Sequence, residues 1–363
     1  MINILYGAGA YAEIFCKELE LNNIKIEYII DEYSNKEYLC NKKILRLSDA
    51  TLSSANIYIS VSSPIFEKDI INNLINKNTK KIITFIEVIT FYPRIISKCL
   101  SINNMWFNKL SHLIPDDKIS ILKTLLQDNH SKQLLEDFIL FRKTLDPKYY
   151  PKPIAEIQYF PNDIKLFKNI NNIRFIDGGA FIGDSLDIIL KCLSKQDKKI
   201  DYIISFEPDQ KNIMLLNQEI EKQKQIYSDV DFLVYPCGLW SENDILSFSN
   251  DGTSTSSIIN NSSKDNLFNI SVVSLDSTIK SATPNYIKLD IEGAEKEAII
   301  GMQNIIKSSS PLLAISLYHN SEDLWELPLL INNINPNYNM YIRLYEQMGL
   351  ELVLYCVPKE YNV

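Results

Sequence analysis

The chain repeats one folding pattern twice: short apolar stretches typical of β-strands alternate with longer stretches typical of helices. Strands that alternate with helices predict a parallel sheet covered by helices, so this pattern places the chain in the α/β class. The first run ends near residue 90. A helical pattern follows, and it closes in residues 146–153, whose prolines cannot continue a helix.

We therefore expect three parts: a small Rossmann-like module (1–90), a helical linker region (91–153) and a larger α/β domain (154–363). The predicted strands of the larger domain are 173–177, 202–206, 232–235, 286–290 and 312–318.

Two features are expected beyond these parallel strands. Residues 340–345 and 350–357 predict two strands with only a short turn between them, and such a hairpin must be antiparallel. Residues 247–269 are rich in serine, asparagine and threonine, which predicts a loop or hairpin.

Composition excludes several classes of protein. A net charge of −8 without a long basic block argues against nucleic-acid binding. Apolar runs stay short of the roughly 20 residues that span a bilayer, and the chain starts without a signal-like segment, so we expect a cytoplasmic protein. The six cysteines form no C-x-x-C pair, which indicates neither zinc nor a disulfide framework.

The strand ends of the larger domain carry the candidate cofactor site, because ligands of parallel sheets bind beyond the carboxyl ends of the strands. The first strand ends in Asp177, Gly178 and Gly179, and Gly183 precedes a helix. Glycines allow a tight turn and close approach of a ligand to the backbone. An acid at this place suits a cationic ligand such as the methionine part of S-adenosylmethionine (SAM) and would repel a pyrophosphate.

The next two strands add to this site. Glu207, followed by Pro208, is placed to accept hydrogen bonds from both hydroxyls of a ribose. Cys237 and Gly238 end the third strand. Strand, glycine turn and distal acid together predict an adenosine ligand.

The fourth and fifth strands carry the candidate catalytic residues Lys288, Asp290 and His319. Strand alternation places Lys288 and Asp290 on one face, where they either organise an acceptor or form an ion pair that only fixes geometry. His319 is expected to be the general base, since an imidazole of ordinary pKa is mostly neutral at pH 7. Asp290 is the second candidate base, and a purely backbone-bonding His319 remains open.

Two further expectations concern this region. No metal is expected, although Asp290, Glu292 and His319 are residue types that also bind Mg²⁺ or Mn²⁺. The other two histidines, His112 and His130, lie in the predicted linker and should be dispensable.

These motifs resemble the FkbM-type SAM-dependent methyltransferases. The resemblance covers residues 155–358 and is carried by Phe175 to Ala180, Phe206 to Pro208, Val273 to Asp276, Ile287 to Glu295, Leu317 to His319 and Asp323 to Trp325. It implies a class I methyltransferase sheet of seven strands and O-methylation of a sugar or polyketide hydroxyl. It also implies that SAM's methionine part lies at Asp177, Gly179 and Gly183, its ribose at Glu207 and its adenine near Cys237 and Gly238, with Asp290 beside the cofactor.

The N-terminal module carries a second nucleotide motif. Gly7, Gly9 and Ala12 follow a predicted strand and open a helix in the pattern G-x-G-x-x-A, and Asp31 ends the next strand. Similar small modules precede some FkbM-type methyltransferases. About 90 residues are expected to hold only half of a full dinucleotide fold.

The expected function is therefore SAM-dependent O-methylation of a sugar or nucleotide-linked sugar, as part of bacterial surface polysaccharide biosynthesis. Two alternatives stay open: an NAD-dependent oxidoreductase or epimerase of nucleotide sugars, and a non-catalytic nucleotide-binding module. Expected partners are the small-molecule substrate and, for a homo-oligomer, a second copy of the chain.

Overall fold

A computed structural model describes residues 2–75, 77–102, 106, 114–249, 267–279 and 282–362. Within these ranges the chain forms two compact units, neither of which is one continuous segment. Unit 1 contains residues 1–114, 133–157 and 343–352, and unit 2 contains 115–132, 158–342 and 353–363. The predicted boundaries at 90 and 153 stay a prediction of domain organisation, and His112 lies outside the described residues.

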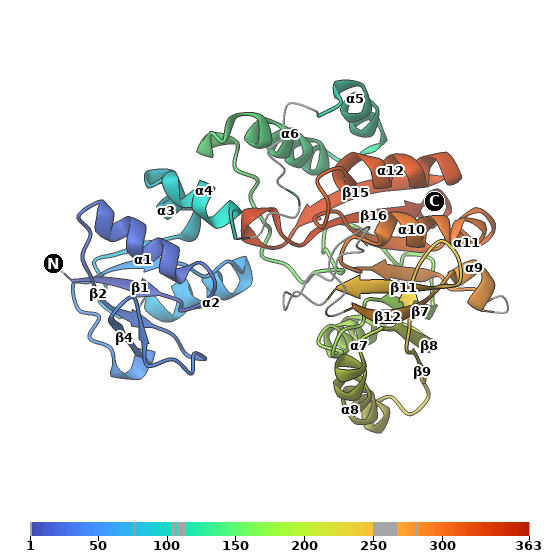
Figure 1. The fold of residues 1–363 in the computed structure, drawn as a ribbon, viewed down its shortest axis with the longest axis horizontal. Helices are drawn as coiled ribbons and strands as arrows, with labels where there is room; N and C mark the ends of the chain where they lie inside the picture. The colour runs from blue at the N-terminus through green and yellow to red at the C-terminus, as the bar shows by residue number, and fades with distance from the viewer. Residues whose placement is uncertain are drawn as a thin grey trace. The chain divides into compact units, whose positions relative to one another are not determined.

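Unit 1 is built on a six-stranded sheet (Figure 1). Its strands and helices are β1 (Asn3–Tyr6), α1 (Ala12–Leu21), β2 (Ile26–Ile30), β3 (Tyr38–Leu39), β4 (Lys42–Leu45), η1 (Leu47–Asp49), β5 (Asn56–Ile59), α2 (Pro64–Leu74), β6 (Lys81–Ile83), α3 (Phe85–Phe91), α4 (Arg94–Leu100) and η3 (Pro147–Tyr149), with η4 (Gln347–Gly349) from the C-terminal region.

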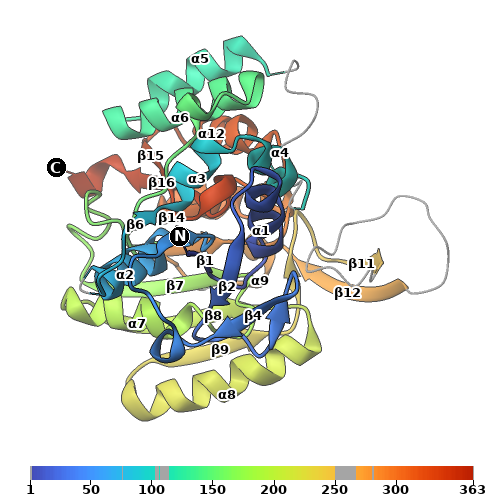
Figure 2. The ribbon, with the colours of Figure 1, turned by 90° about the vertical axis from the view of Figure 1, so that its left-hand side faces the viewer.

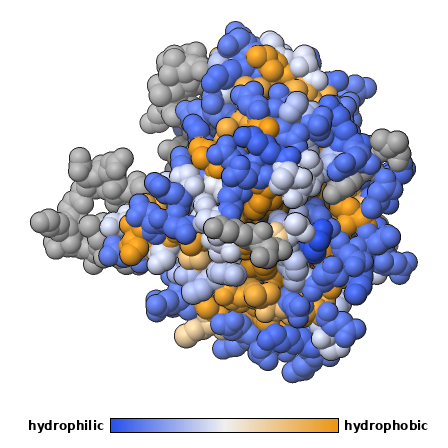
Figure 3. Space-filling view, turned by 90° about the vertical axis from the view of Figure 1, so that its right-hand side faces the viewer, coloured by the Kyte–Doolittle hydropathy of each residue, from blue (hydrophilic) through white to orange (hydrophobic). Residues whose placement is uncertain are grey.

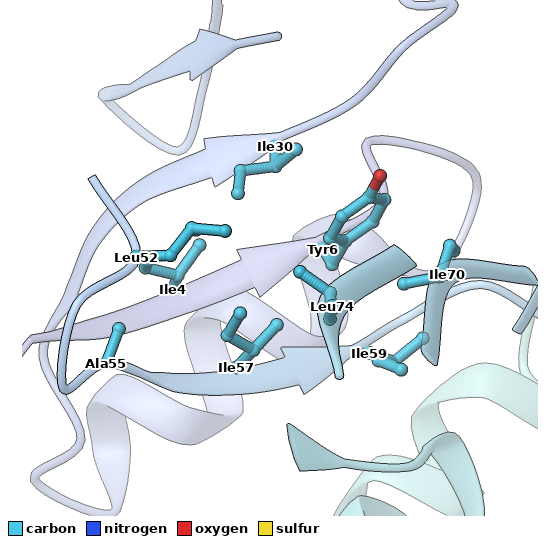
Figure 4. Close-up of a cluster of buried hydrophobic side chains, with 9 residues drawn as sticks. All are labelled: Ile4, Tyr6, Ile30, Leu52, Ala55, Ile57, Ile59, Ile70 and Leu74. Atoms are coloured by element: carbon cyan, nitrogen blue, oxygen red, sulfur yellow. The ribbon is translucent and has the colours of Figure 1, made fainter. Parts of the chain in front are cut away.

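The sheet order of unit 1 is β3-β4-β2-β1-β5-β6, and all neighbours except β3 and β4 pair in parallel. Strands therefore lie on both sides of β1, so the expectation of only half a dinucleotide fold is wrong. Apolar residues of β1, β2, β5, α2 and the loop before β5 form the buried core that Figure 4 shows, namely Ile4, Tyr6, Ile30, Leu52, Ala55, Ile57, Ile59, Ile70 and Leu74.

Unit 2 contains a seven-stranded sheet with helices. Its elements are α5 (Asp116–Leu125), β7 (Asn172–Gly178), α7 (Leu186–Lys195), β8 (Lys199–Phe206), α8 (Gln210–Ile226), β9 (Asp231–Tyr235), β10 (Gly238–Leu239), β11 (Asp244–Ser249), β12 (Leu267–Val273), α9 (Leu275–Thr278), β13 (Tyr286–Leu289), α10 (Glu295–Ile300), α11 (Gln303–Ser309), β14 (Leu312–Ser316), α12 (Asp323–Ile334) and η5 (Lys359–Asn362). Three elements cross the boundary between the units or lie on it: α6 (Asn129–Thr144), β15 (Tyr338–Leu344) and β16 (Leu352–Pro358).

The large sheet has the order β15-β16-β14-β13-β7-β8-β9. The strands from β14 to β9 are parallel to one another, and β16 is antiparallel to β14. The predicted strands of this domain are all present. Because β7, β8, β13 and β14 are parallel neighbours, the residues that follow them reach the same edge of the sheet.

A smaller sheet of β10, β12 and β11 follows β9 along the chain. Strands β11 and β12 pair antiparallel, as the predicted hairpin requires, and Figure 2 shows them extending away from the large sheet. The part of that prediction between 250 and 266 lies outside the described residues.

The region predicted as a linker contributes directly to unit 2. Leu126 forms a parallel bridge with Met340, and Gln127 N donates to Met340 O at 3.0 Å, so this segment continues the sheet beyond β15. Lys118 of α5 forms an ion pair with Glu326 of α12. These contacts explain why residues 115–132 belong to unit 2.

The surface of the molecule is mainly hydrophilic on the side that Figure 3 shows, with hydrophobic residues gathered in smaller patches. None of the helices in the described ranges combines the length and apolar character that a bilayer span requires.

Candidate active site

β7 ends in Asp177 and Gly178, and the glycine turn that follows it packs tightly against neighbouring residues. Gly179 has φ +76°, a left-handed conformation that favours glycine, and a Cβ there would overlap the carbonyl oxygen of Asp290. Phe206 O accepts from Gly179 N at 3.0 Å and from Ala180 N at 3.1 Å. Gly183, at φ +80°, lies against Leu216 of α8. The turn is therefore fixed by strands on both sides and by a helix.

Glu207 ends β8 beside this turn, and its carboxylate is already engaged. Oε2 accepts from Phe181 N at 2.9 Å, and Oε1 accepts from Asp209 N at 2.9 Å and Asn212 Nδ2 at 3.2 Å. Burial raises the pKa of Glu207. A carboxylate offers about four acceptor positions, so about one remains in this conformation, fewer than the two that a ribose diol was expected to use.

The third strand end also lies at this edge, since Glu207 N donates to Tyr235 O at 3.2 Å. Pro208 follows Glu207 directly and is half-buried. Cys237 is buried, which raises the pKa of its thiol to about 11, and Gly238 begins β10. Contact of these residues with an adenine stays a prediction.

Lys288 pairs with Asp177 rather than with Asp290, which corrects the ion pair considered from the sequence. The two residues are register partners on β13 and β7, and Lys288 Nζ lies 2.9 Å from Asp177 Oδ1. Lys288 Nζ also donates to Gly179 O at 2.9 Å. Burial lowers the pKa of Lys288, but the charges of Asp177 and Asp290 outweigh it, so the net shift is upward.

Tyr159 also belongs to this site, although no motif in the sequence marks it. Its hydroxyl donates to Asp290 Oδ2 at 3.1 Å, and its ring lies 5.6 Å from Lys288 Nζ. Its carbonyl accepts from the Tyr286 hydroxyl at 3.4 Å. Tyr286, Lys288 and Asp290 thus all lie beside Tyr159.

Asp290 follows β13 directly and faces β14. The Tyr318 hydroxyl donates to its Oδ1 at 3.0 Å, and His319 Nε2 lies 3.5 Å from the same oxygen. Burial raises the pKa of Asp290, but the positive charges of Lys288 and His319 outweigh burial and hold it below its ordinary value. Asp290 is therefore ionised at neutral pH.

His319 forms a hydrogen bond with Glu295 through the Nδ1 side of its ring. Nδ1 lies 2.8 Å from Glu295 Oε1, and Glu295, fully buried at the start of α10, also accepts from Ile291 N at 2.8 Å. Burial lowers the pKa of His319, but the charges of Glu295, Asp290 and Glu292 outweigh burial and raise it to about 10. These carboxylates favour the protonated imidazole, whereas the sequence predicted a neutral one.

Asp290, Glu295 and His319 each offer a ligand atom, and these atoms lie within 4.8 Å of one another. The sequence had grouped Glu292, rather than Glu295, with Asp290 and His319. Glu292 Oε2 lies 3.6 Å from His319 Nε2 on the more exposed side of the cluster. His130, predicted to be dispensable, lies outside the cluster, 3.9 Å from Asp163.

The N-terminal motif forms the predicted strand, turn and helix. Gly7 has φ +106° and donates its N–H to Ile30 O at 2.8 Å, Gly9 lies in the turn, and Ala12 begins α1. Asp31 accepts from three backbone amides, those of Ala8 at 2.7 Å, Tyr33 at 2.8 Å and Ser34 at 2.7 Å. The Asp31 carboxylate thus stabilises the loops after β1 and β2. Ligand binding at this motif stays a prediction.

The fold of the chain is similar to that of a known methyltransferase. The family model described as "Methyltransferase FkbM domain" matches residues 177–345, so this part of the chain is similar to the FkbM methyltransferases. A solved structure of a methyltransferase FkbM from Methylobacillus flagellatus KT is similar over 98% of this chain and 89% of that chain, with a TM-score of 0.57 and 19% identity. At that identity the likeness concerns the fold.

The CMeT domain of the citrinin polyketide synthase aligns with 73% of this chain and 69% of its own, at 10% identity. Its TM-score of 0.30 is too low to carry an argument. Among curated proteins, no sequence matches this chain.

Proposed function

We propose that the chain transfers the methyl group of SAM to a hydroxyl of a sugar or nucleotide-linked sugar, as a step in bacterial surface polysaccharide biosynthesis. The observation that carries the proposal is the shared sheet edge: the Asp177 to Gly183 turn and Glu207 lie beside Asp290 and His319. A cofactor bound by the glycine turn and Glu207 would present its methyl group to Asp290 and His319.

The charges of the site support a cationic cofactor. Among the described residues, the cations that pair with the four carboxylates of Asp177, Asp290, Glu292 and Glu295 are Lys288 and protonated His319. A surplus of negative charge attracts the sulfonium and ammonium groups of SAM. Because Asp177 is already paired with Lys288, we propose that it both holds the glycine turn and shares its charge with the methionine part of SAM.

The reaction requires an acceptor oxygen in line with the methyl carbon. The carbon–oxygen bond forms as the carbon–sulfur bond breaks, its electron pair stays on sulfur, and the hydroxyl proton leaves. Asp290 is ionised and lies at the strand end, so we propose it as the proton acceptor, with His319 and Lys288 fixing its position. His319 is protonated at neutral pH because its pKa is raised, so it can act as a base only after it has lost that proton. Positioning supplies most of the rate.

The sugar class of the acceptor rests on the resemblance to FkbM-type enzymes. Two measurements test the acceptor class and the binding of SAM. Calorimetry with S-adenosylhomocysteine measures cofactor binding, and mass spectrometry of a panel of nucleotide sugars incubated with protein and SAM measures gain of a methyl group.

Four variants make the test specific. Glu207→Gln should weaken S-adenosylhomocysteine binding, Asp290→Asn and His319→Ala should lower the rate of transfer, and His130→Ala should behave as the parent. Folded protein that does not bind S-adenosylhomocysteine would refute the SAM proposal. Binding without methyl gain on any sugar of the panel would refute the acceptor class only.

A further inference from the structure

The imidazole of His319 presents one nitrogen without a hydrogen-bond partner among the described residues. This atom, Nε2, is buried, and the His319 side chain is only 2% exposed. Burying a polar atom unpaired is costly, so such an atom requires an explanation. Two carboxylate oxygens surround it: Asp290 Oδ1 at 3.5 Å and Glu292 Oε2 at 3.6 Å.

These separations are too long for ordinary hydrogen bonds but suit two ligands of one ion. An N–H···O bond spans about 2.7–3.2 Å. Two ligand atoms that each lie about 2.1 Å from a divalent cation are separated by about 3.0 Å at a right angle and about 3.4 Å at the tetrahedral angle. The distance of each oxygen from Nε2 therefore differs by about half an ångström or less from the separation that two ligands of one ion require.

The opposite side of the ring has the support that a metal-binding histidine needs. His319 Nδ1 lies 2.8 Å from Glu295 Oε1, and Glu295 is itself fixed by the Ile291 N–H. A histidine that binds metal through one nitrogen usually donates its other N–H to such a carboxylate, which fixes the ring and its tautomer. Tyr318 similarly holds Asp290 through a 3.0 Å hydrogen bond.

We propose that His319 Nε2, Asp290 Oδ1 and Glu292 Oε2 bind one divalent cation of the Mn²⁺ type, which displaces the proton from Nε2, with Glu295 as the carboxylate that orients the histidine. One imidazole and two carboxylates form a mixed nitrogen and oxygen ligand set that suits Mn²⁺. Glu292 is 48% exposed, so the remaining positions of the ion face the open side of the site, where water or a substrate oxygen can bind. A role of the ion in methyl transfer rests on the proposed function, but binding of the ion does not.

The test uses the full-length protein, stripped of metal, and Mn²⁺ as the probe. Calorimetry should give one Mn²⁺ per chain, and electron spin echo spectroscopy should show modulation from an imidazole nitrogen. His319→Ala should lose that modulation, and Glu295→Gln should weaken binding about 10- to 100-fold. Asp290→Asn provides a second ligand variant, and His130→Ala, at a histidine outside the cluster, should bind as the parent does.

Circular dichroism first establishes that each variant is folded. Absence of saturable Mn²⁺ binding by the parent would overturn the proposal, as would imidazole modulation that persists in folded His319→Ala protein. If His319→Ala does not fold, unchanged affinity in folded Asp290→Asn and Glu295→Gln would equally overturn it. These measurements contain no SAM, so their failure leaves the proposed methyl transfer standing.

Discussion

Replacing Gly179 with alanine tests how closely the cofactor turn is fitted to the sheet. The φ of +76° costs an L-residue about 1–2 kcal/mol, and the new Cβ would overlap the Asp290 carbonyl. Forcing a methyl group into a packed site costs about 1–3 kcal/mol more. We therefore expect Gly179→Ala to lower the free energy of unfolding of unit 2 by about 2–5 kcal/mol. Urea unfolding followed by circular dichroism measures this loss.

The matched control is Gly9→Ala in the other glycine turn. A Cβ at Gly9 meets no described atom within 4 Å, and its φ lies outside the left-handed region. The change should leave stability within about 0.5 kcal/mol or raise it slightly by restricting the unfolded chain. Equal effects of the two substitutions would refute the argument that the Asp290 carbonyl, rather than the loss of glycine as such, sets the cost.

Three further predictions follow from the charged residues. Glu207→Gln should weaken S-adenosylhomocysteine binding about tenfold in calorimetry, because one charge-assisted hydrogen bond becomes neutral; unchanged affinity would exclude Glu207 from the ribose site. Lys288→Met should lower the free energy of unfolding by about 3–5 kcal/mol, because Asp177 is left buried without its partner, and removing both charges in Lys288→Met/Asp177→Leu should recover much of that loss. For His319, the native pKa of about 10 exceeds the unfolded value near 6.5. Its stabilising contribution is therefore complete below pH 6.5 and lost as pH rises through 10. The stability difference between parent and His319→Gln should shrink over that range in urea titrations, and a constant difference would contradict the assigned shift.

The strands of the large sheet were predictable because each is an apolar run bounded by polar residues. The short strands β3, β4 and β10 were not, because their sequences YL, KKIL and GL contain no apolar run of sufficient length. The placement of residues 115–132 in unit 2 also escaped prediction, because it depends on a bridge to Met340 far along the chain.

At the site, the sequence identified residues but not their partners. Strand alternation placed Lys288 and Asp290 on one face, yet only the register of β13 against β7 sets Lys288 beside Asp177. Tyr159 lies outside any strand and carried no motif. The protonation of His319 depends on Glu295, and residue spacing alone does not show that these two side chains meet at 2.8 Å.

The pair of Lys288 and Asp177 also constrains the order in which the protein is made and folded. The two residues are separated by 111 positions, so Asp177 leaves the ribosome well before its counter-charge exists. Burying either charge alone is costly, which holds the end of β7 in water until β13 has been synthesised and docked beside it. On a nascent chain that stops short of residue 288, burial of the end of β7 therefore lacks the charge that stabilises it in the native sheet.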